Sequence, residues 1–348
     1  MKKRLIYFLL IIFTGSLFLG CELKHKFSTV GKEYDLLLFT DKEFHDENEE
    51  LIYSSLSDDI FFTHKESKFN ILKKNIKDIE KLKKYKNIII IDNVLTTDDV
   101  TTFLSDALGS DTVFNVEEMT IAHKKDVWGE GQSVVFILFN GKYFTKSKLS
   151  KALDKGTDIL NNYVQKRIEK QVFQEDKNNK LVKKVNEKLN LDLFIPKRYF
   201  LFKEEENFVS TVTRAPDRLY FFHVTENIPE VFDQNTLYGI RDRLTDKYYN
   251  GDRVFRKLNE WKKEDKDINY FVGYKELKIK NNIVYKIHGL WENVEDTNGG
   301  PFITYFFVKD KKLYVFDAML FHPGGNKWPY INKMDIIQKK NVENNLLE

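Results

Sequence analysis

The sequence contains a single cysteine, Cys21, among its 348 residues. A lone cysteine has no disulfide partner within the chain, which excludes the small scaffolds that depend on cross-links. The stability of the fold must therefore come from hydrophobic cores. Long apolar runs are also lacking, because the longest, residues 5–19, is shorter than the roughly 20 apolar residues of a transmembrane helix.

The N-terminal segment has the layout of an export signal. Three basic residues precede the apolar run, and Gly20 and Cys21 follow it. A charged region, a short apolar region and small residues at the cut are typical of a signal peptide. We expect residues 1–20 to be a lipoprotein signal peptide, and lipid on Cys21 to hold the mature chain on a membrane. An N-terminal membrane anchor with an incidental cysteine is the alternative.

The segment at residues 18–21 resembles the bacterial lipobox, although Phe18 stands where an aliphatic residue is usual. Under either interpretation the rest of the chain lies outside the cytoplasm. We expect a location in the bacterial cell envelope, anchored by lipid to the outer membrane. Residues 21–32 are short and polar, which suits a tether between the lipid and the folded part.

Charge of one sign is not in excess, because 56 Lys and Arg stand against 53 Asp and Glu, a net charge of +3. Removal of residues 1–20 removes three basic residues and no acidic ones, so the mature chain has a side-chain charge of about 0 (3 − 3). Nucleic-acid binding depends on the neutralisation of phosphates by basic side chains. We therefore exclude nucleic acid and expect an envelope protein or a small ligand as partner, besides the membrane.

Motifs that carry chemistry are lacking as well. The sequence has no Gly-x-Ser-x-Gly elbow, no glycine-rich phosphate loop and no His pair at the spacing of HExxH. His223 and His288 would approach each other if their strands were neighbours, with Glu292 to orient either of them. Isolated histidines at strand ends are the alternative, because a metal site needs three or four ligands. The sequence thus assigns no catalytic residue, no metal and no cofactor.

Aromatic residues are abundant, at 14% of the chain, and they recur in alternating stretches that favour β-strands. About 330 mature residues exceed what one hydrophobic core usually serves. The fold class we expect is α+β, with two domains of mostly antiparallel sheet and packed helices. The expected order is an N-terminal α+β domain at 33–145, a long helical connector at 146–195, a C-terminal α+β domain at 196–340 and a tail at 341–348.

Residues 88–91 are four consecutive isoleucines, which predict a central strand with both faces covered. Further strands are expected from alternating patterns at 34–39, 119–124, 134–139, 199–202, 208–213 and 219–223. Two hairpins are expected at 270–278 with 283–291 and at 302–308 with 313–321. Helices are expected at 43–56, 98–108, 236–248 and 329–340, and over 146–189 with a break near 174–180.

Several segments stand together in an order typical of one family: residues 87–92, 125–128, 189–198, 289–292 and 299–302. In these segments the chain resembles an uncharacterised family of lipoproteins from Bacteroidetes-type bacteria, classed as a domain of unknown function (DUF4837). The HGLWE and NGGPF segments are the most specific part. The resemblance implies a lipidated N-terminal cysteine and supplies no activity. Residues 195–340 have a looser resemblance to the PsbP-like α/β/α sandwich, which is fold analogy only.

Four residues are candidates for binding. Trp291 and the pair Gly299 and Gly300 lie between two predicted strands, where the tryptophan is either an anchor for a partner or a core side chain behind a tight turn. Arg241 lies early in a predicted helix, where a basic residue suits the dipole poorly. It is expected to hold a carboxylate, either that of a ligand or that of Asp317.

The sequence favours a non-enzymatic binding or assembly module of the cell envelope. The alternative is an envelope hydrolase whose site is assembled from scattered residues. An enzyme needs a deep pocket with convergent ionisable groups. A docking module needs an exposed apolar patch of a few hundred Å².

Overall fold

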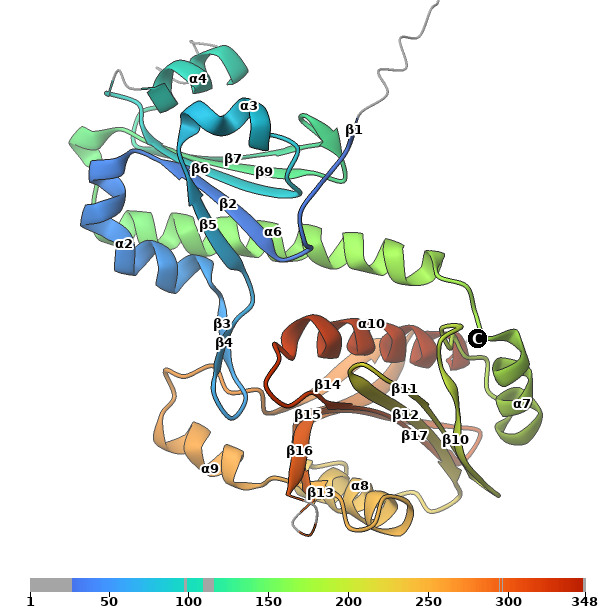
Figure 1. Ribbon diagram of the computed structural model, residues 1–348. Coiled ribbons are helices and arrows are strands. Elements are labelled where there is room, and N and C mark those ends of the chain that lie inside the picture. The colour runs from blue at the N-terminus through green and yellow to red at the C-terminus, as the bar shows by residue number, and fades with distance from the viewer. Residues whose placement is uncertain (1–26, 97–98, 109–115, 294, 296, 347–348) are drawn as a thin grey trace, which may run out of the picture.

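The computed structural model describes residues 27–96, 99–108, 116–293, 295 and 297–346 (Figure 1). The predicted signal peptide and Cys21 lie outside these residues. Two lobes are stacked on each other, an N-lobe (residues 27–174) and a C-lobe (residues 179–346), and the chain passes between them after a long helix. The α+β class is confirmed. In the described part of the chain no helix is long and apolar enough to cross a membrane.

The N-lobe is built on a five-stranded sheet. Its strands, in spatial order, are β5 (Asn70–Lys74), β2 (Asp35–Thr40), β6 (Asn87–Asn93), β9 (Ser133–Phe139) and β7 (Met119–Lys125). The first four are parallel, and only β7 runs antiparallel to its neighbour. A mostly antiparallel sheet was thus the wrong prediction for this lobe. The reason is that helical crossovers cover both faces, which is the setting of parallel strands.

The isoleucine run in β6 explains why both faces are covered. Ile89 and Ile91 pack into a core with the helices α2 (Lys42–Leu56) and α6 (Lys146–Gln174). Ile88 and Ile90 pack into a second core with α4 (Asp99–Leu108) and the short helices η1 (Ile76–Asp78) and α3 (Ile79–Leu82). All four isoleucines are fully buried, so the central strand predicted at 88–91 is confirmed.

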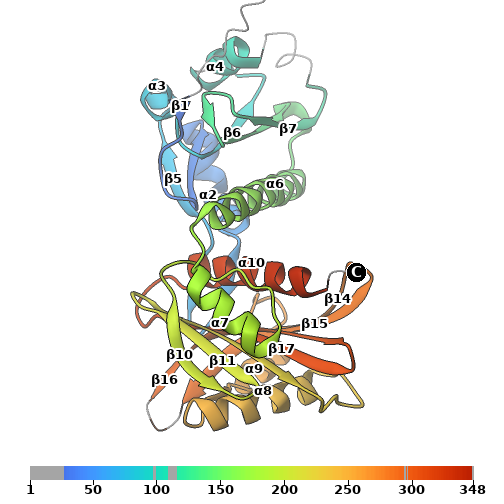
Figure 2. The same ribbon diagram turned by 90° about the vertical axis from the view of Figure 1, so that its right-hand side faces the viewer.

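Smaller elements complete the N-lobe: β1 (Phe27–Ser28) with β8 (Gly129–Glu130), the hairpin β3 (Asp59–Phe61) with β4 (Lys65–Ser67), and η2 (Gly141–Tyr143). The segment predicted as a helical connector contains two helices, α6 and α7 (Asn179–Leu189). Helix α6 packs along the N-lobe sheet and continues over the C-lobe (Figure 1). Figure 2, which views α6 nearly end-on, shows it between the N-lobe sheet and α10. The predicted break near 174–180 lies between the two helices.

The C-lobe sheet is antiparallel throughout its described strands. Its order is β10 (Phe200–Glu205), β11 (Phe208–Thr213), β12 (Asp217–Thr225), β17 (Lys312–Phe321), β16 (Asn298–Lys309), β15 (Asn282–Asn293) and β13 (Arg253–Val254), with β14 (Gly273–Ile279) also paired to β15. Both predicted hairpins are confirmed, as β14 with β15 and β16 with β17.

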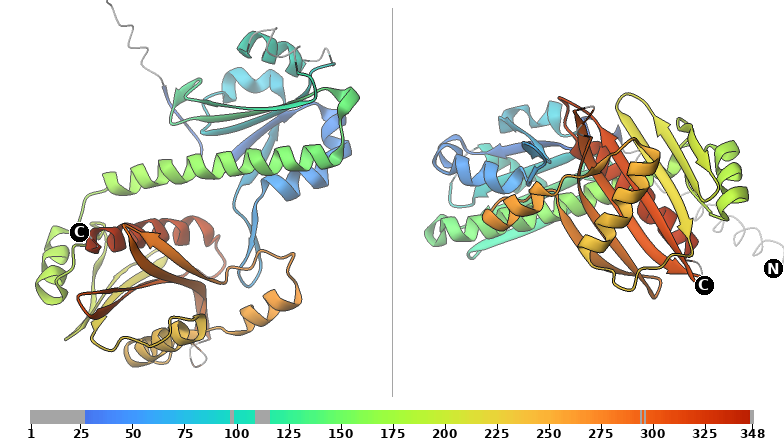
Figure 3. Two further views of the ribbon diagram at one scale, coloured as in Figure 1. Left: turned by 180° about the vertical axis from the view of Figure 1, so that it is seen from behind. Right: turned by 90° about the horizontal axis from the view of Figure 1, so that it is seen from below.

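Helices lie on both faces of the C-lobe sheet (Figure 3). Helix α10 (Trp328–Asn345) covers the face toward the N-lobe, and α8 (Gln234–Tyr248) covers the opposite face, next to α9 (Lys257–Glu264). The two layers of core confirm a helix–sheet–helix arrangement. The likeness to PsbP stays a prediction.

The hairpin formed by β3 and β4 reaches from the N-lobe into the C-lobe. Phe61 N donates to Asn269 O over 2.9 Å, and Phe271 N donates to Phe61 O over 2.8 Å. The buried carboxylate of Glu66 accepts from Lys327 N at 2.7 Å and lies 3.0 Å from Lys327 Nζ, at the start of α10. Because the contacts of Glu66 with Lys327 are buried, the hairpin fixes the position of α10 relative to the N-lobe.

Candidate functional site

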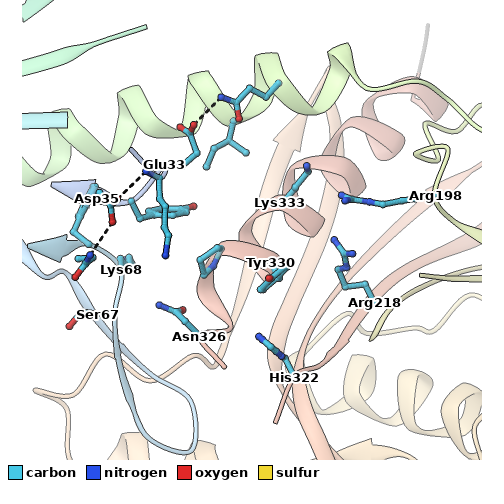
Figure 4. A pocket seen from close by; sticks show the side chains of 17 residues that line it. Glu33, Asp35, Ser67, Lys68, Arg198, Arg218, His322, Asn326, Tyr330 and Lys333 are labelled. Carbon is cyan, nitrogen blue, oxygen red and sulfur yellow. Dashed lines mark hydrogen bonds between the residues drawn. The ribbon is translucent and has the colours of Figure 1, made fainter. Parts of the chain in front are cut away.

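A cavity of about 900 Å³ lies between the two lobes (Figure 4). Its N-lobe wall comes from residues 32–35, from residues 67–70 after β4, and from α6. Its C-lobe wall comes from Arg198 just before β10, from Arg218 in β12, from His322 just after β17, and from residues 326–333 at the start of α10. Ligand pockets usually have volumes of about 300–1,000 Å³, so the cavity is large enough for an organic ligand.

On the N-lobe wall, Glu33 is neutralised within the protein. Its carboxylate contacts Lys86 and Arg167, the latter over 2.5 Å, and accepts from Gln171 Nε2 over 3.0 Å. Burial opposes ionisation of Glu33, but the charges and hydrogen bonds of these neighbours outweigh it and hold its pKa below the ordinary value. Glu33 is therefore an ionised group that already has its partners.

The other charged groups on this wall are also engaged. Asp35 accepts from Lys32 N and from Asn70 Nδ2, both over 3.0 Å. Lys68 Nζ forms an ion pair with Asp58 over 2.9 Å. The N-lobe wall thus offers hydrogen-bonding groups, the carboxylate of Asp35, whose two donors are neutral, and the exposed amine of Lys32, whose charge is opposite to that of Asp35.

The C-lobe wall is basic. Arg198, Arg218 and Lys333 reach toward the same part of the cavity, as Figure 4 shows. A single carboxylate, that of Glu175, contacts Lys333 Nζ through one oxygen and lies 3.7 Å from Arg198 Nη2 through the other. Arg198 and Lys333 therefore share one negative charge.

Arg218 has no carboxylate partner among the residues that the structure describes. Its side chain is only 6% exposed, and its Nε donates to Pro216 O over 3.3 Å. The guanidinium carbon lies 5.5 Å from the centre of the Tyr330 ring. A buried charge is costly unless it is paired, so an unpaired buried arginine at a cavity is an unusual group.

The phenol groups of Tyr199 and Tyr220 lie near Arg218 and do not supply a negative charge to it. The rings of Tyr199 and Tyr220 stack at 5.0 Å. Burial raises the pKa of Tyr199 above its ordinary value and raises the pKa of Tyr220 well above its ordinary value. The positive charge of Arg218 opposes both shifts without cancelling them. Both phenols therefore stay neutral at physiological pH.

Local structure accounts for this convergence. Arg218 is the second residue of β12 and lies on the same face as Tyr220 and Phe222, because alternate residues of a strand share a face. Tyr330 and Lys333 are three residues apart in α10, which places them on one side of the helix. Arg198 lies just before β10. Three segments far apart in sequence thus form one wall.

A smaller hollow of about 190 Å³ also lies between the lobes. In it, Asp335 binds Lys286 over 2.7 Å and accepts from Tyr305 Oη over 2.7 Å. Burial, with a further contribution from the charge of Lys286, lowers the pKa of His288 to about 3, so its ring is neutral. Asp335, Lys286 and Tyr305 thus have their partners within the protein and suit a structural role, whereas Nδ1 of His288 is buried without a hydrogen-bond partner among the described residues.

Trp291 lies in the core on the α8 side of the C-lobe sheet. Its side chain is 7% exposed, and its Nε1 donates to Leu320 O over 3.3 Å. A Cβ on Gly300 would lie 2.0 Å from that same oxygen, and one on Gly299 would lie 2.8 Å from Trp291 O. The backbone of the chain itself, at Leu320 and Trp291, thus occupies the space that side chains on Gly300 and Gly299 would need. A binding role for the three residues stays a prediction.

Arg241 is also buried, far from the basic wall in the fold. Its Nε lies 2.9 Å from Asp317 Oδ2, and its guanidinium carbon lies 3.9 Å from the centre of the Phe302 ring. Burial raises the pKa of Asp317, while Arg241 opposes that rise. Of the two carboxylates considered from the sequence, the structure places that of Asp317 against Arg241.

The structure does not bring the candidate histidines together. His223 lies on β12 and His288 on β15, with β17 and β16 between them. Glu292 forms an ion pair with Arg253 instead. Within the described residues no group of three His, Cys, Asp or Glu side chains could hold a metal ion.

The basic wall was missed from the sequence, although one signal was present. In β12, residues 218, 220 and 222 face the core, where apolar side chains are usual. Arg218 is the charged residue at the first of these positions. Arg198 and Lys333 carried no comparable signal, because each belongs to a segment with many lysines and arginines.

A search of curated proteins gave no match. Among solved structures, a crystal structure from Bacteroides thetaiotaomicron VPI-5482 is similar over 39% of this chain and 40% of that chain, with 9% sequence identity and a TM-score of 0.22. The chain thus spans less than half of that protein. Residues 178–340 match the family described as "Domain of unknown function (DUF4837)". The predicted family is therefore confirmed, and its lipoprotein character stays a prediction. The part of the chain that is similar to the DUF4837 family, residues 178–340, includes Arg198, Arg218 and Lys333.

Proposed function

We propose that this protein is an exported lipoprotein, held on a membrane by lipid on Cys21, that binds a small ligand in the cavity between its two lobes. The anchor is supported by the charged and apolar N-terminal regions and by the position of the lone cysteine. Binding is supported by one observation above the others. The cavity of about 900 Å³ is lined from both lobes by polar side chains, and the buried Arg218 has no carboxylate partner among the described residues.

The contacts of the cavity favour binding over hydrolysis. The hydroxyl of Ser67 donates to the carboxylate of Asp59 over 2.7 Å and not to a histidine of the kind that activates a serine nucleophile. The ring of His322 packs edge-on against Tyr330, with 5.2 Å between the ring centres. Ser67 and His322 are thus engaged with other residues and do not form a serine–histidine pair.

The binding proposal is tested by thermal denaturation of the purified protein with a panel of amino acids, sugars, nucleosides and phosphate esters. We expect at least one compound to raise Tm, because a ligand that binds only the folded state stabilises it. Ser67→Trp, which adds an indole to an exposed position at the cavity, should remove the rise. Ser54→Trp, on the exposed side of α2, is the matched control and should keep it. A rise that is equal in both variants would contradict binding in this cavity.

The anchor is tested separately in cells. Cys21→Ser should abolish incorporation of labelled fatty acid and leave an uncut precursor, because the serine has no thiol to accept the lipid. Labelling that persists in the serine variant would contradict the lipoprotein proposal and leave the binding proposal unaffected.

A further inference from the structure

We infer that the C-lobe wall of the cavity is a subsite for a phosphoryl group, so that the ligand is a phosphorylated small molecule. This inference rests on the proposed function, because it assigns a ligand class to the same cavity. It goes further by naming the residues that recognise the ligand, which are Arg218, Arg198 and Lys333.

The buried guanidinium is the central observation. Arg218 is 6% exposed, and within the part of the chain that the structure describes its only hydrogen bond joins Nε to Pro216 O. An arginine side chain carries five N–H donors in a planar fork. That fork matches two oxygens of a phosphate or a carboxylate. An anion in the cavity would supply the partner that the protein does not.

The net charge of the wall favours a dianion. Arg218, Arg198 and Lys333 contribute three positive charges, and Glu175, which contacts two of them, contributes one negative charge. The sum is about +2 (3 − 1), and a phosphate monoester carries about −1.5 to −2 at pH 7. A single carboxylate would leave one positive charge without a counterpart. The wall therefore suits a phosphoryl group better than a carboxylate.

The neighbouring groups do not supply this negative charge. Burial keeps the phenols of Tyr199 and Tyr220 neutral. On the opposite wall, Glu33 is bound by Lys86 and Arg167, so it offers no free negative charge to the basic side chains. The charge of the C-lobe wall is thus available to a ligand.

The rest of the cavity indicates an ester, not a free ion. A volume of about 900 Å³ is far larger than a phosphate ion requires. The remaining surface includes the rings of Tyr34, Phe69 and Tyr330 and the amide of Asn70. Aromatic faces and an amide suit the organic part of a ligand.

The inference is tested by isothermal titration calorimetry of the purified protein at low ionic strength. The probes are inorganic phosphate and glucose 6-phosphate, with acetate and glucose as their counterparts of lower charge. We expect both phosphates to bind the wild-type protein more tightly than either counterpart. Arg218→Met should weaken phosphate binding by about ten-fold or more, because a charge-assisted hydrogen bond is lost. The exposed Arg253→Met, which lies on β13, is the matched control and should bind like wild type.

Two further variants guard against a folding defect in Arg218→Met. Arg198→Met and Lys333→Met change side chains that are 44% and 25% exposed, so both variants should fold. Each should weaken phosphate binding by about three-fold or more, as expected for the loss of one partly screened charge. Unchanged affinity in all three variants of the wall would overturn the inference.

The outcomes separate this inference from the proposal on which it rests. If uncharged or cationic compounds bind the cavity and bind Arg218→Met as tightly as wild type, the phosphoryl subsite is wrong and the binding proposal stands. If the phosphates and every compound of the panel fail to bind the wild-type protein, both fall.

Discussion

The two walls of the cavity differ in whether their charged side chains have counter-ions within the protein. On the N-lobe side, Glu33 is held by Lys86 and Arg167, and its charge is balanced within the lobe. On the C-lobe side, Arg218 is buried without a carboxylate partner among the described residues, and Lys333 shares its counter-ion. The N-lobe wall therefore shapes the cavity, and the C-lobe wall has the charge to recognise what enters it.

The sheets of the two lobes also differ in the charge that they bury. The central strand of the N-lobe sheet carries only isoleucines at residues 88–91, which pack into apolar cores on both faces. The C-lobe sheet contains the ion pair of Arg241 with Asp317, where both side chains are fully buried. Removal of one partner from a buried pair leaves an uncompensated charge. The C-lobe should therefore be the lobe that is sensitive to changes of charge.

The largest effect is expected from Arg241→Met. It leaves Asp317 without its cation, so the free energy of unfolding should fall by about 3–5 kcal/mol in urea denaturation. The double variant Arg241→Met, Asp317→Leu should recover most of the loss, because no buried charge remains. In the N-lobe, Ile90→Val should cost only about 0.5–1.5 kcal/mol. An equal loss from Ile90→Val and Arg241→Met would remove the difference between the lobes.

A somewhat smaller loss is expected from Trp291→Ala. The indole is 7% exposed and donates to Leu320 O, so its removal should cost about 3 kcal/mol and lower Tm. Trp261, which is 37% exposed on α9, is the matched control and should tolerate alanine with a smaller loss. A Trp291→Ala variant that melts like wild type and loses an envelope partner in a pull-down would make Trp291 a binding anchor instead.

The contact between the lobes should be weakened by Glu66→Ala. The variant removes the acceptor of Lys327 N and the partner of its ammonium group at the start of α10. We expect a loss of about 2 kcal/mol in thermal or urea denaturation. Glu80→Ala removes an exposed ion pair within the N-lobe and should cost less than about 0.5 kcal/mol. If the two variants lose the same stability, the hairpin does not fix α10.

The smallest effect concerns Glu33 and pH. Its pKa is lowered in the folded protein, so its contribution to stability is present above the unfolded value near 4.5 and is lost as pH falls through the folded value. The melting temperature of Glu33→Gln should therefore fall less than that of wild type as pH is lowered below about 4.5. Parallel pH profiles for the two proteins would show that Glu33 is not stabilised as an ion.

Much of the C-lobe could be predicted from its sequence because its signals are local. Alternating aromatic residues mark the strands, and each turn carries one residue that tolerates left-handed backbone, Asn281 or Asp310. Lys280 and Asn281 have φ of 47° and 65°, and Asp310 and Lys311 have φ of 50° and 58°. Two such residues form the tight turn that joins hairpin strands. Neighbours in sequence are thus neighbours in the sheet.

The direction of the N-lobe strands could not be predicted in the same way. Four isoleucines indicate burial on both faces and say nothing about which strand lies alongside. The pairing of β6 with β2 and β9 joins segments separated by helices, so it depends on tertiary packing. For the same reason the convergence of Arg198, Arg218 and Lys333 was beyond the sequence. The one sequence signal for this site was a charged residue, Arg218, at a position of its strand that faces the core.

The difference between the two walls is tested most directly by one calorimetric comparison. Inorganic phosphate is titrated into wild type, into Arg218→Met on the C-lobe wall and into Lys32→Met on the N-lobe wall, both of which line the cavity. We expect Arg218→Met to lose about ten-fold or more in affinity and Lys32→Met to change by less than about two-fold. An equal or greater loss in Lys32→Met would contradict recognition by the C-lobe wall.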